Sequence, residues 1–333
     1  MSAPRHPCSV RVLMMQRDEG PLLLSWFSHY ARLFGMDRLT VMDNGSRDPL
    51  TLHVLAQAEA RGALIDRRHS GPEDFQAKGL HFARVIRSWD ADPGIAGTYD
   101  MALPVDCDEF IAAVDADRIS TATEAVHDAL AEVAHEKRAL RLELSLFNVP
   151  DRPGWFAVDP DFCKGAIPAG GVDLIDNGQH MPNSALEPGF AATRLTYLHW
   201  HNRPFDEMRE RARQKIGTSL IDPTDDSDLR RYAMVRQAPG RHLLPVLLRD
   251  AQWYRARYDD SLRLFVPEGA APGGAALPGE TGSPVIEDRR GRRTWSDTAY
   301  LAANSDVANY PLGPLHHFLR YGWAEGRLER PSA

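Results

Sequence analysis

Few cysteines and no long apolar run occur in this sequence, and each shortage argues against a class of protein. The 333 residues include only Cys8, Cys107 and Cys163, which are odd in number and lack metal-type spacing. Neither a disulfide framework nor a structural zinc site is indicated, and a reducing compartment is favoured. The sequence has no run of about 18 apolar residues and no signal-peptide pattern near its N-terminus. We expect a cytoplasmic protein, and we leave open peripheral association with the inner face of the membrane.

A surplus of basic charge is also missing. The formal net charge is −7, from 39 lysines and arginines against 46 aspartates and glutamates. Proteins that bind nucleic acid need cations to displace counterions from the phosphates, so we expect no nucleic-acid partner. The remaining composition, 43% hydrophobic and 26% charged, is that of an ordinary globular protein with one large domain and an appendage, or two domains.

Two nucleotide-binding motifs are absent as well. No G-x-G-x-x-G follows the first predicted strand, which disfavours a dinucleotide-binding fold. No G-x-x-x-x-G-K-[ST] occurs, which disfavours a P-loop. A nucleotide site in this chain would therefore depend on other groups, and a metal-assisted site remains.

What is present is an alternation of strand and helix patterns. Short apolar runs predict buried strands over residues 9–16, 38–42 and 63–66, and a central strand that begins at Tyr99. Between them, apolar residues at three- and four-residue steps predict helices over 21–34, 49–61 and 75–89. This alternation predicts an α/β domain with a mainly parallel central sheet.

Polar clusters stand where three of these strands end. They are Arg17-Asp18-Glu19, Asp43-Asn44-Gly45-Ser46 and Asp106-Cys107-Asp108-Glu109. Because ligands of parallel sheets bind beyond the carboxyl ends of the strands, we expect the clusters to converge. The three carboxylates of the last cluster repel one another unless a cation compensates them. Mn²⁺ or Mg²⁺ would suit these oxygen ligands, whereas a solvated acidic turn is the alternative.

These motifs resemble the opening of bacterial family-2-like glycosyltransferases with a GT-A fold, and of a D-x-D-E-F group similar to glycosyltransferase family 92. The first motif departs from the usual Lys-Asn-Glu wording, since Arg17-Asp18 precedes Glu19. The resemblance covers about residues 9 to 217. It rests on Arg17-Asp18-Glu19-Gly20 with Trp26 and His29, the stretch 41–48, the stretch 106–110, the stretch 142–148, Lys164-Gly165-Ala166-Ile167, His180, His199-Trp200-His201-Asn202-Arg203, Lys215 and Gly217.

The resemblance implies a GT-A type nucleotide-sugar-binding fold and a metal-dependent glycosyltransferase, hexosyltransferase-like. The implied donor is a nucleotide-diphospho-sugar, for which we expect a UDP-sugar. The implied acceptor is a bacterial surface glycan or a lipid-linked saccharide, as in polysaccharide biosynthesis, and we expect inversion at the anomeric carbon.

The same resemblance assigns residues to the donor and the metal. Glu19 and Asp43 would lie near the nucleotide base, and Asp106 near the diphosphate. Asp106, Asp108 and His199 would hold the Mn²⁺ or Mg²⁺. The alternative for His199, as for His201, is a histidine hydrogen-bonded in the core.

Cations and a catalytic base complete the predicted site. Arg84, Arg203 and Lys215 are candidates to neutralise the phosphates, and each could instead be a solvated helix cation. Spacing does not choose among the acidic residues and histidines of 159–190, of which we favour Asp176 and His180, with roles in a loop as the alternative. Glu109 is a further catalytic candidate.

The last third of the chain predicts an appendage. We expect a glycosyltransferase domain over 1–230, a helical extension over 231–265, a Gly/Pro-rich linker over 266–287 and a small C-terminal helical module over 288–333. The module resembles a repeat appended to bacterial surface-polysaccharide glycosyltransferases. It could grip the acceptor, or it could pack an apolar face on the core through Leu315, Phe318, Leu319 and Trp323.

Two other functions fit parts of the pattern. A nucleotidyltransferase would also use paired carboxylates and a metal, but it usually needs a Gly-rich phosphate loop after the first strand, which residues 17–21 do not form. A carbohydrate-binding protein could keep the same fold without turnover. Release of nucleotide from a nucleotide-sugar would separate transfer from binding alone.

Overall fold

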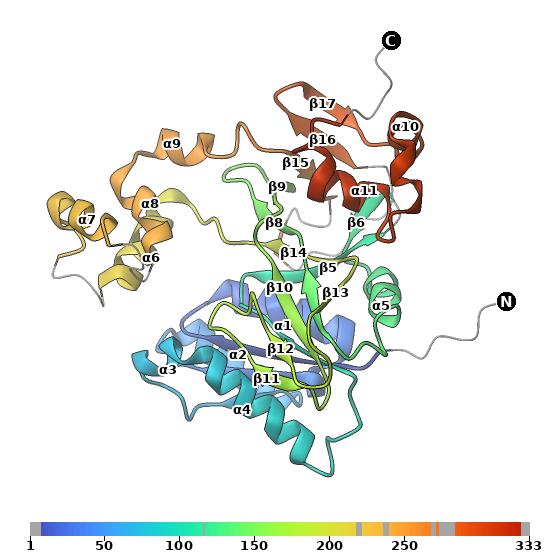
Figure 1. The fold of residues 1–333 in the computed structure, drawn as a ribbon. Helices are drawn as coiled ribbons and strands as arrows, with labels where there is room; N and C mark the ends of the chain where they lie inside the picture. The colour runs from blue at the N-terminus through green and yellow to red at the C-terminus, as the bar shows by residue number, and fades with distance from the viewer. Residues whose placement is uncertain are drawn as a thin grey trace.

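The fold was analysed in a computed structural model that describes residues 8–115, 117–217, 222–235, 240–267, 271–272 and 284–327. Two sheets form the centre of the molecule. Helices α1 to α4 lie around the strands that the N-terminal half of the chain contributes (Figure 1). One sheet has seven strands in the order β13-β7-β10-β4-β1-β2-β3. The other has eight strands in the order β17-β16-β15-β9-β8-β14-β5-β6.

The N-terminal half follows the predicted alternation. Its strands β1 (Val10–Gln16), β2 (Leu39–Asp43), β3 (Leu64–Asp66) and β4 (Met101–Pro104) pair in parallel. The helices between them are α1 (Pro21–Phe34), α2 (Pro49–Ala60), α3 (Pro72–Gln76) and α4 (Lys78–Ala91). Every residue of β1 is buried, as expected of a strand covered on both faces. Gly35 ends α1 with φ of 92°, a conformation that side chains with a Cβ rarely adopt.

The prediction of a mainly parallel sheet is wrong, because the sheet is mixed. Beyond β4 the neighbour is β10 (Lys164–Pro168), which runs antiparallel to both β4 and β7 (Ala139–Leu142). The edge strand β13 (Phe190–Ala192) then pairs in parallel with β7. Parallel neighbours need long crossovers, usually helical, and the segment from 139 to 192 contains no helix in this structure. The strand–helix alternation of the first hundred residues therefore does not extend to this half of the sheet.

The chain passes from the first sheet to the second at the turn that carries Asp106, Asp108 and Glu109. After β4 the chain makes a short turn over residues 105–108 and enters β5 (Glu109–Asp115), which belongs to the eight-stranded sheet. The other strands of that sheet are β6 (Arg118–Ser120), β8 (Ser145–Asn148), β9 (Trp155–Asp159), β14 (Leu195–His199), β15 (Arg263–Phe265), β16 (Val285–Asp288) and β17 (Gly291–Thr294). A small hairpin of β11 (Val172–Leu174) and β12 (Asn183–Ser184) lies beside α4, and α5 (Thr123–Ala131) covers β5. The acidic turn is thus the corner between the two sheets.

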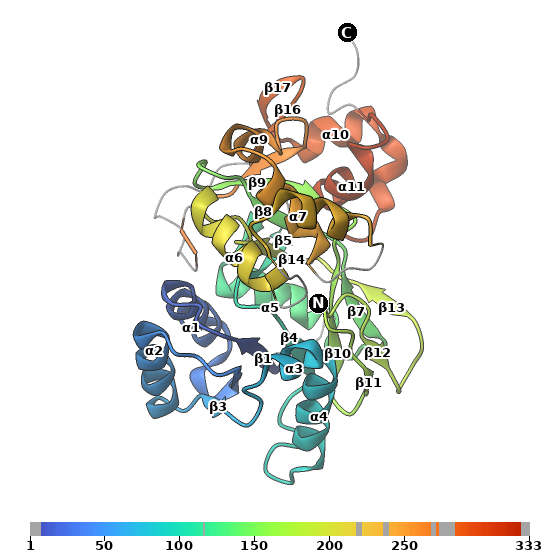
Figure 2. The same cartoon turned by 90° about the vertical axis from the view of Figure 1, so that its left-hand side faces the viewer.

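Helices α6 to α9 lie at the left of the molecule in Figure 1, on the side that faces the viewer in Figure 2. They are α6 (Phe205–Gly217), α7 (Asp226–Ala233), α8 (Leu244–Leu248) and α9 (Ala251–Ala256). Met208, Ile216, Leu229, Leu247 and Tyr254 meet in a small core of their own. The predicted boundary at residue 230 falls inside α7, and residues of α6 share this core with residues of α7 to α9.

The C-terminal part of the chain packs on the main core. Strands β15 to β17 extend the eight-stranded sheet, followed by α10 (Asp297–Ala303) and α11 (Pro314–His317). Leu315, Phe318 and Leu319 are buried in the same apolar cluster as the strands around the site, and Trp323 packs against it. Most of the predicted linker over 266–287 lies outside the described residues. Packing explains the apolar face of the module, while a role in gripping an acceptor stays a prediction.

Within the described ranges, none of the helices has the length and apolar character needed to cross a membrane.

Glu287 on β16 forms ion pairs that connect the C-terminal hairpin to the rest of the sheet. We expect their contribution to stability to be lost in acid. Its carboxylate accepts from Arg152 at 2.8 Å, lies 2.9 Å from Arg263 and 3.0 Å from Arg292, and the hydrogen bond from Arg152 lowers its pKa from 4.5 to about 2. Because the pKa of Glu287 is lower in the folded than in the unfolded chain, its ion pairs stabilise the folded state fully at pH values above the unfolded pKa. That stability is lost as the pH falls from about 4.5 towards 2. Glu287→Gln should lower stability at neutral pH and flatten its decline below pH 4.5, as measured by urea unfolding at several pH values. Equal pH profiles for wild type and Glu287→Gln, with exposed Glu124→Gln as the control, would contradict this role.

Candidate active site

The corner between the sheets brings the acidic turn next to the end of β14. Glu109 opens β5 and pairs with His199, the last residue of the antiparallel β14. The backbone N–H of Trp200 donates to the carbonyl of Asp108 at 2.7 Å. This pairing sets the residues after β14 directly against the carboxylates of residues 106–109.

Asp108, His199 and His201 form a partly exposed group at this corner. One carboxylate oxygen of Asp108 lies 3.3 Å from Nε2 of His199 and 3.7 Å from Nδ1 of His201. The three possible ligand atoms all lie within 4.8 Å of one another. The side chains of Asp108 and His201 are about a quarter exposed, at 25% and 24%. The group therefore combines a carboxylate and two imidazoles with access from solvent.

The charges within this group depend on one another. Burial alone would raise the pKa of Asp108, but His199 and His201 lower it well below its usual range. Asp108 in turn raises the pKa of His199 against the effect of burial, whereas burial lowers the pKa of His201. Asp108 is therefore held as an anion, and the neutral form of His201 is favoured at its open side. The ion pair with Asp108 favours the protonated form of His199, which must lose that proton before its Nε2 can bind a metal.

Aromatic side chains fix the orientation of His199. Its ring centroid lies 4.5 Å from that of Phe147, at the end of β8, and 5.3 Å from that of Phe162. Phe162 also packs edge-on against His180, with centroids 4.8 Å apart. The imidazole of His199 thus packs against both phenylalanine rings, which also contact each other, while its Nε2 faces Asp108.

Asp106 has different partners from those predicted. Its two carboxylate oxygens lie 2.5 Å from Nζ of Lys78 and 3.0 Å from Nζ of Lys164. Burial alone would raise the pKa of Asp106, but the two lysines lower it. Lysines therefore provide the compensating charge that the sequence led us to assign to a metal at this residue.

Glu109 is enclosed rather than presented to a substrate. Its side chain has no exposed area, and its carboxylate lies 2.8 Å from Nζ of Lys164. The other oxygen accepts from the backbone N–H of Asp106 at 2.9 Å, which closes the acidic turn. This geometry gives Glu109 a role in holding the turn and gives no support to the predicted catalytic role.

Glu19 faces the site from the loop after β1. It lies 2.6 Å from Nη2 of Arg211 on α6 and 3.3 Å from Nη2 of Arg203. Burial raises its pKa, while Arg211 opposes that effect. At the end of β2, Oδ1 of Asp43 accepts from Gln16 at 2.9 Å and from the hydroxyl of Ser46 at 2.5 Å. The predicted nucleotide residues Glu19 and Asp43 thus both lie at carboxyl ends of parallel strands.

The candidate bases Asp176 and His180 share one tight turn. Asp176 accepts from the backbone N–H groups of Gly178 and Met181 at 3.1 and 2.7 Å, and Nδ1 of His180 lies 2.7 Å from the carbonyl of Cys163. The carbonyl of Gly178 accepts from Lys164 at 2.8 Å. The turn therefore abuts the lysine network, with both candidates engaged in local contacts.

For two of the predicted cations, another basic residue on the same helix makes the contact with the site. Arg84 is exposed on α4, whereas Lys78 from the first turn of that helix reaches Asp106. Lys215 is exposed on α6, whereas Arg211, one turn earlier, reaches Glu19. Sequence reasoning missed Lys78 even though it lies four residues before Phe82 on the buried face of α4, which is the signal that could have revealed it.

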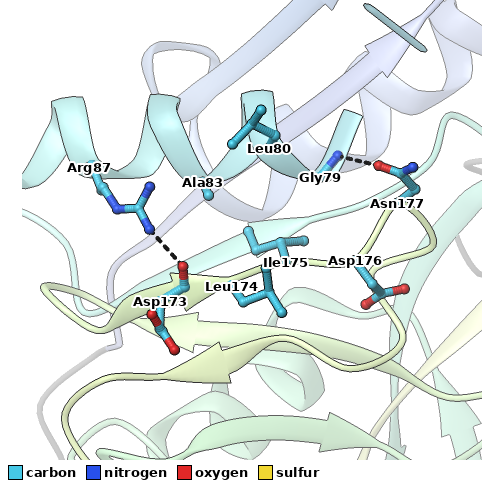
Figure 3. Close-up of a pocket in the computed structure, with 9 residues that line it drawn as sticks. All are labelled: Gly79, Leu80, Ala83, Arg87, Asp173, Leu174, Ile175, Asp176 and Asn177. Carbon is cyan, nitrogen blue, oxygen red and sulfur yellow. Dashed lines mark hydrogen bonds between the residues drawn. The ribbon is translucent and has the colours of Figure 1, made fainter. Parts of the chain in front are cut away.

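A cavity of about 290 Å³ lies between α4 and the segment that follows β11 (Figure 3). Its wall is closed by hydrogen bonds from Gly79 N–H to the Asn177 side chain at 3.0 Å and from Arg87 to the carbonyl of Asp173 at 2.6 Å. A Cβ at position 79 would lie 2.2 Å from the carbonyl oxygen of Ile175, so helix and loop touch closely there. Asp176 lies at one end of the row of residues that line the cavity (Figure 3).

Comparisons with known proteins do not assign this chain to a family. No protein-family model and no curated protein matches it. Among solved structures, it is similar to a crystal structure of S. aureus TarS, with 12% identity and a TM-score of 0.33 over 70% of this chain. The match covers 43% of that TarS chain, so this protein spans less than half of its length.

Two structures of residues 1–349 of S. aureus TarS are similar over almost the whole chain. The first has 11% identity and a TM-score of 0.34, covering 97% of this chain and 93% of that one. The second, a complex with UDP, has 11% identity and a TM-score of 0.31, covering 98% and 94%. Likeness at these TM-scores supports no conclusion about the chemistry of this chain.

Proposed function

We propose that this protein is a metal-dependent glycosyltransferase that moves a sugar from a nucleotide-diphospho-sugar to a saccharide acceptor. The observation that carries the proposal is the solvent-accessible group of Asp108, His199 and His201 at the strand ends, with Arg203 and Arg211 around Glu19 nearby. The sequence resemblance to family-2-like glycosyltransferases supports a UDP-sugar donor, inversion, and a bacterial surface glycan or lipid-linked saccharide as acceptor.

Asp108, His199 and His201 would hold the metal. One carboxylate oxygen and two imidazole nitrogens make a donor set that suits Mn²⁺ better than Mg²⁺, because Mg²⁺ prefers oxygen ligands throughout. The exposed sides of Asp108 and His201 leave room for water or phosphate oxygens. When bound, such a metal supplies Lewis-acid stabilisation of the charge that develops on the departing diphosphate.

The lysine network beside the metal group is balanced in charge. Lys78 and Lys164 face Asp106 and Glu109, so that two ammonium groups meet two carboxylates. This network can orient the acidic turn and donate hydrogen bonds, but it brings no net positive charge. We therefore assign Asp106 to positioning the lysines, in place of direct metal binding.

Two arginines lie on the other side of the metal group. Arg203 and Arg211 share the carboxylate of Glu19 at 3.3 and 2.6 Å, and the exposed Glu207 lies 3.9 Å from Arg211. Guanidinium groups bind phosphate oxygens in a bidentate manner. We propose that this pair binds the diphosphate, with Glu19 holding both guanidinium groups and Asp43 on the side of the base.

Incubation of the full-length protein with a panel of nucleotide-sugars and Mn²⁺ tests this function. We expect release of UDP from one or more UDP-sugars, and loss of that release when EDTA removes the metal. A nucleotidyltransferase would instead release pyrophosphate from a nucleoside triphosphate and a sugar phosphate. A binding protein would show calorimetric titration with UDP, GDP or CMP and no release from any donor, and either result would refute the proposal.

A further inference from the structure

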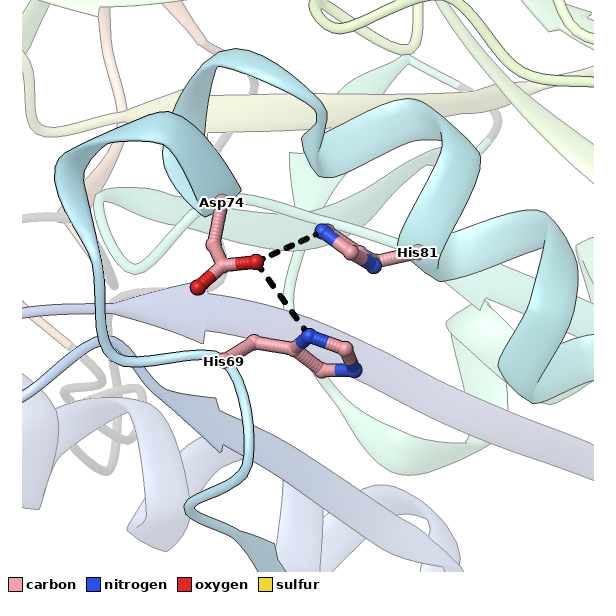
Figure 4. A group of neighbouring side chains, drawn as sticks. All are labelled: His69, Asp74 and His81. Carbon is pink, nitrogen blue, oxygen red and sulfur yellow. Dashed lines mark hydrogen bonds and ion pairs between the residues drawn. The ribbon is translucent and has the colours of Figure 1, made fainter.

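A second group of possible metal ligands lies away from the acidic corner (Figure 4). His69 comes from the loop between β3 and α3, Asp74 from α3 and His81 from α4. Oδ1 of Asp74 lies 3.3 Å from Nδ1 of His69 and 3.1 Å from Nε2 of His81. The three atoms all lie within 4.8 Å of one another. Three separate segments thus direct one ligand atom each at a common point.

The spacing is close enough for the three atoms to share one ion. Zn²⁺ binds imidazole nitrogen and carboxylate oxygen at about 2.0–2.2 Å, which places neighbouring tetrahedral ligand atoms about 3.3–3.5 Å apart. The distance from Asp74 to His69 is 3.3 Å and that to His81 is 3.1 Å, and the two imidazole rings pack with centroids 3.9 Å apart. We propose that His69, Asp74 and His81 bind a transition-metal ion of the Zn²⁺ class, at a site distinct from Asp108, His199 and His201.

One oxygen of Asp74 is free to meet an ion. The backbone N–H of Gly71 donates to Oδ2 of Asp74 at 3.0 Å. Oδ1 is then left to face the two imidazoles (Figure 4).

The exposure of the group gives an entry path and an open fourth position. The side chain of His81 is 7% exposed, whereas those of His69 and Asp74 are 26% and 22% exposed. An ion can therefore reach the group from the side of His69 and Asp74, and water can occupy the remaining position. Two imidazoles with one carboxylate and one water make a donor set that zinc accepts.

A metal at this site would connect the loop after β3 to α4, the helix whose Lys78 contacts Asp106 in the candidate active site. The side-chain amide of Asn44, at the end of β2, donates to the carbonyls of His69 and Gly71 at 2.8 and 2.7 Å. His81 lies one helical turn after Lys78, whose ammonium group contacts Asp106. A metal here would join these segments and hold the first turn of α4, so we assign it a structural role.

The competing explanation is a hydrogen-bonded triad without metal. Both imidazoles could donate to Asp74, and the buried Nδ1 of His81 has no hydrogen-bond partner in the described part of the chain. That arrangement needs no ion, so direct metal binding distinguishes the two explanations.

The experiment uses the full-length chain with Asp108→Asn, so that binding at the acidic corner is weakened. The protein is stripped with EDTA, dialysed and titrated with Co²⁺, whose visible absorption is strong in tetrahedral sites, and with Zn²⁺ followed by metal analysis. We expect about one bound ion, a tetrahedral Co²⁺ spectrum and a higher melting temperature with Zn²⁺. Adding His69→Gln or Asp74→Asn should lower the affinity at least about tenfold.

Glu73→Gln, which changes an exposed carboxylate next to Asp74, is the matched control and should leave binding unchanged. Circular dichroism checks that each variant is folded. The proposal is overturned if the Asp108→Asn chain binds neither ion, or if His69→Gln and Asp74→Asn bind both ions as tightly as the Glu73→Gln control. No donor or acceptor is needed, so the outcome is independent of the proposed transferase activity.

Discussion

Asp108→Asn should abolish most metal-dependent binding of UDP while leaving the protein folded. The substitution keeps the size of the side chain and removes the anionic oxygen that lies 3.3 Å from His199 and 3.7 Å from His201. A metal site that loses its only carboxylate loses at least about tenfold in affinity. Calorimetric titration of UDP in the presence of Mn²⁺, and again with EDTA, measures the change.

Asp106→Asn is the informative comparison for this experiment. Because Asp106 contacts Lys78 and Lys164, we expect this variant to keep its affinity for Mn²⁺ while losing stability. If Asp106→Asn and Asp108→Asn weaken Mn²⁺ binding equally, Asp106 is a ligand and the assignment made here is wrong. If Asp108→Asn binds UDP and turns over as wild type, even with EDTA present, the metal proposal fails.

Lys164→Met should cause the largest loss of stability of any single change at the site. The ammonium group is 1% exposed and lies 3.0 Å from Asp106 and 2.8 Å from Glu109. Although burial alone would lower the pKa of Lys164, these carboxylates raise it, so the charge is part of the folded state. Removing one partner of a buried ionic network leaves uncompensated charge and costs about 3–5 kcal/mol of unfolding free energy. Chemical denaturation at neutral pH measures the loss.

A second substitution in the same chain tests the cause. Glu109→Gln removes one of the carboxylates that Lys164→Met leaves uncompensated, so the double variant should recover part of the lost stability. Lys78→Met is the matched control, because Asp106 would still have Lys164 as a partner, and we expect a smaller loss. An unfolding free energy of Lys164→Met within about 1 kcal/mol of wild type, or a double variant no more stable than the single one, would contradict the network described here.

Local sequence patterns predicted the strands that deliver the acidic residues. The apolar runs before Glu19, Asp43 and Asp106 are long enough to identify β1, β2 and β4, and turn residues mark where each strand ends. The carboxyl ends of parallel neighbours then lie together for a topological reason, which needs no knowledge of side-chain contacts.

The partners of these residues could not be predicted in the same way. Whether Asp106 or Asp108 meets histidines depends on the pairing of Glu109 with His199, a register between strands that lie about ninety residues apart in the chain. Lys164 presents the same difficulty, because β10 reaches Asp106 only by entering the first sheet antiparallel to β4. Strand register depends on tertiary packing, and no local pattern encodes it.

The pairing of β9 with β15 has a consequence for how the protein is made. Ala157 pairs with Arg263, so β9 waits for 106 further residues, from 157 to 263, to be synthesised before its partner exists. At ribosomal rates this takes about 5–20 s. During that time the backbone N–H and C=O groups along one side of β9 are open to pairing with another chain. The sheet that carries the Asp108–His199 corner is therefore completed late in translation, and a ribosome that stalls before β15 would release a chain with an unpaired strand edge, which chaperones would have to protect from aggregation.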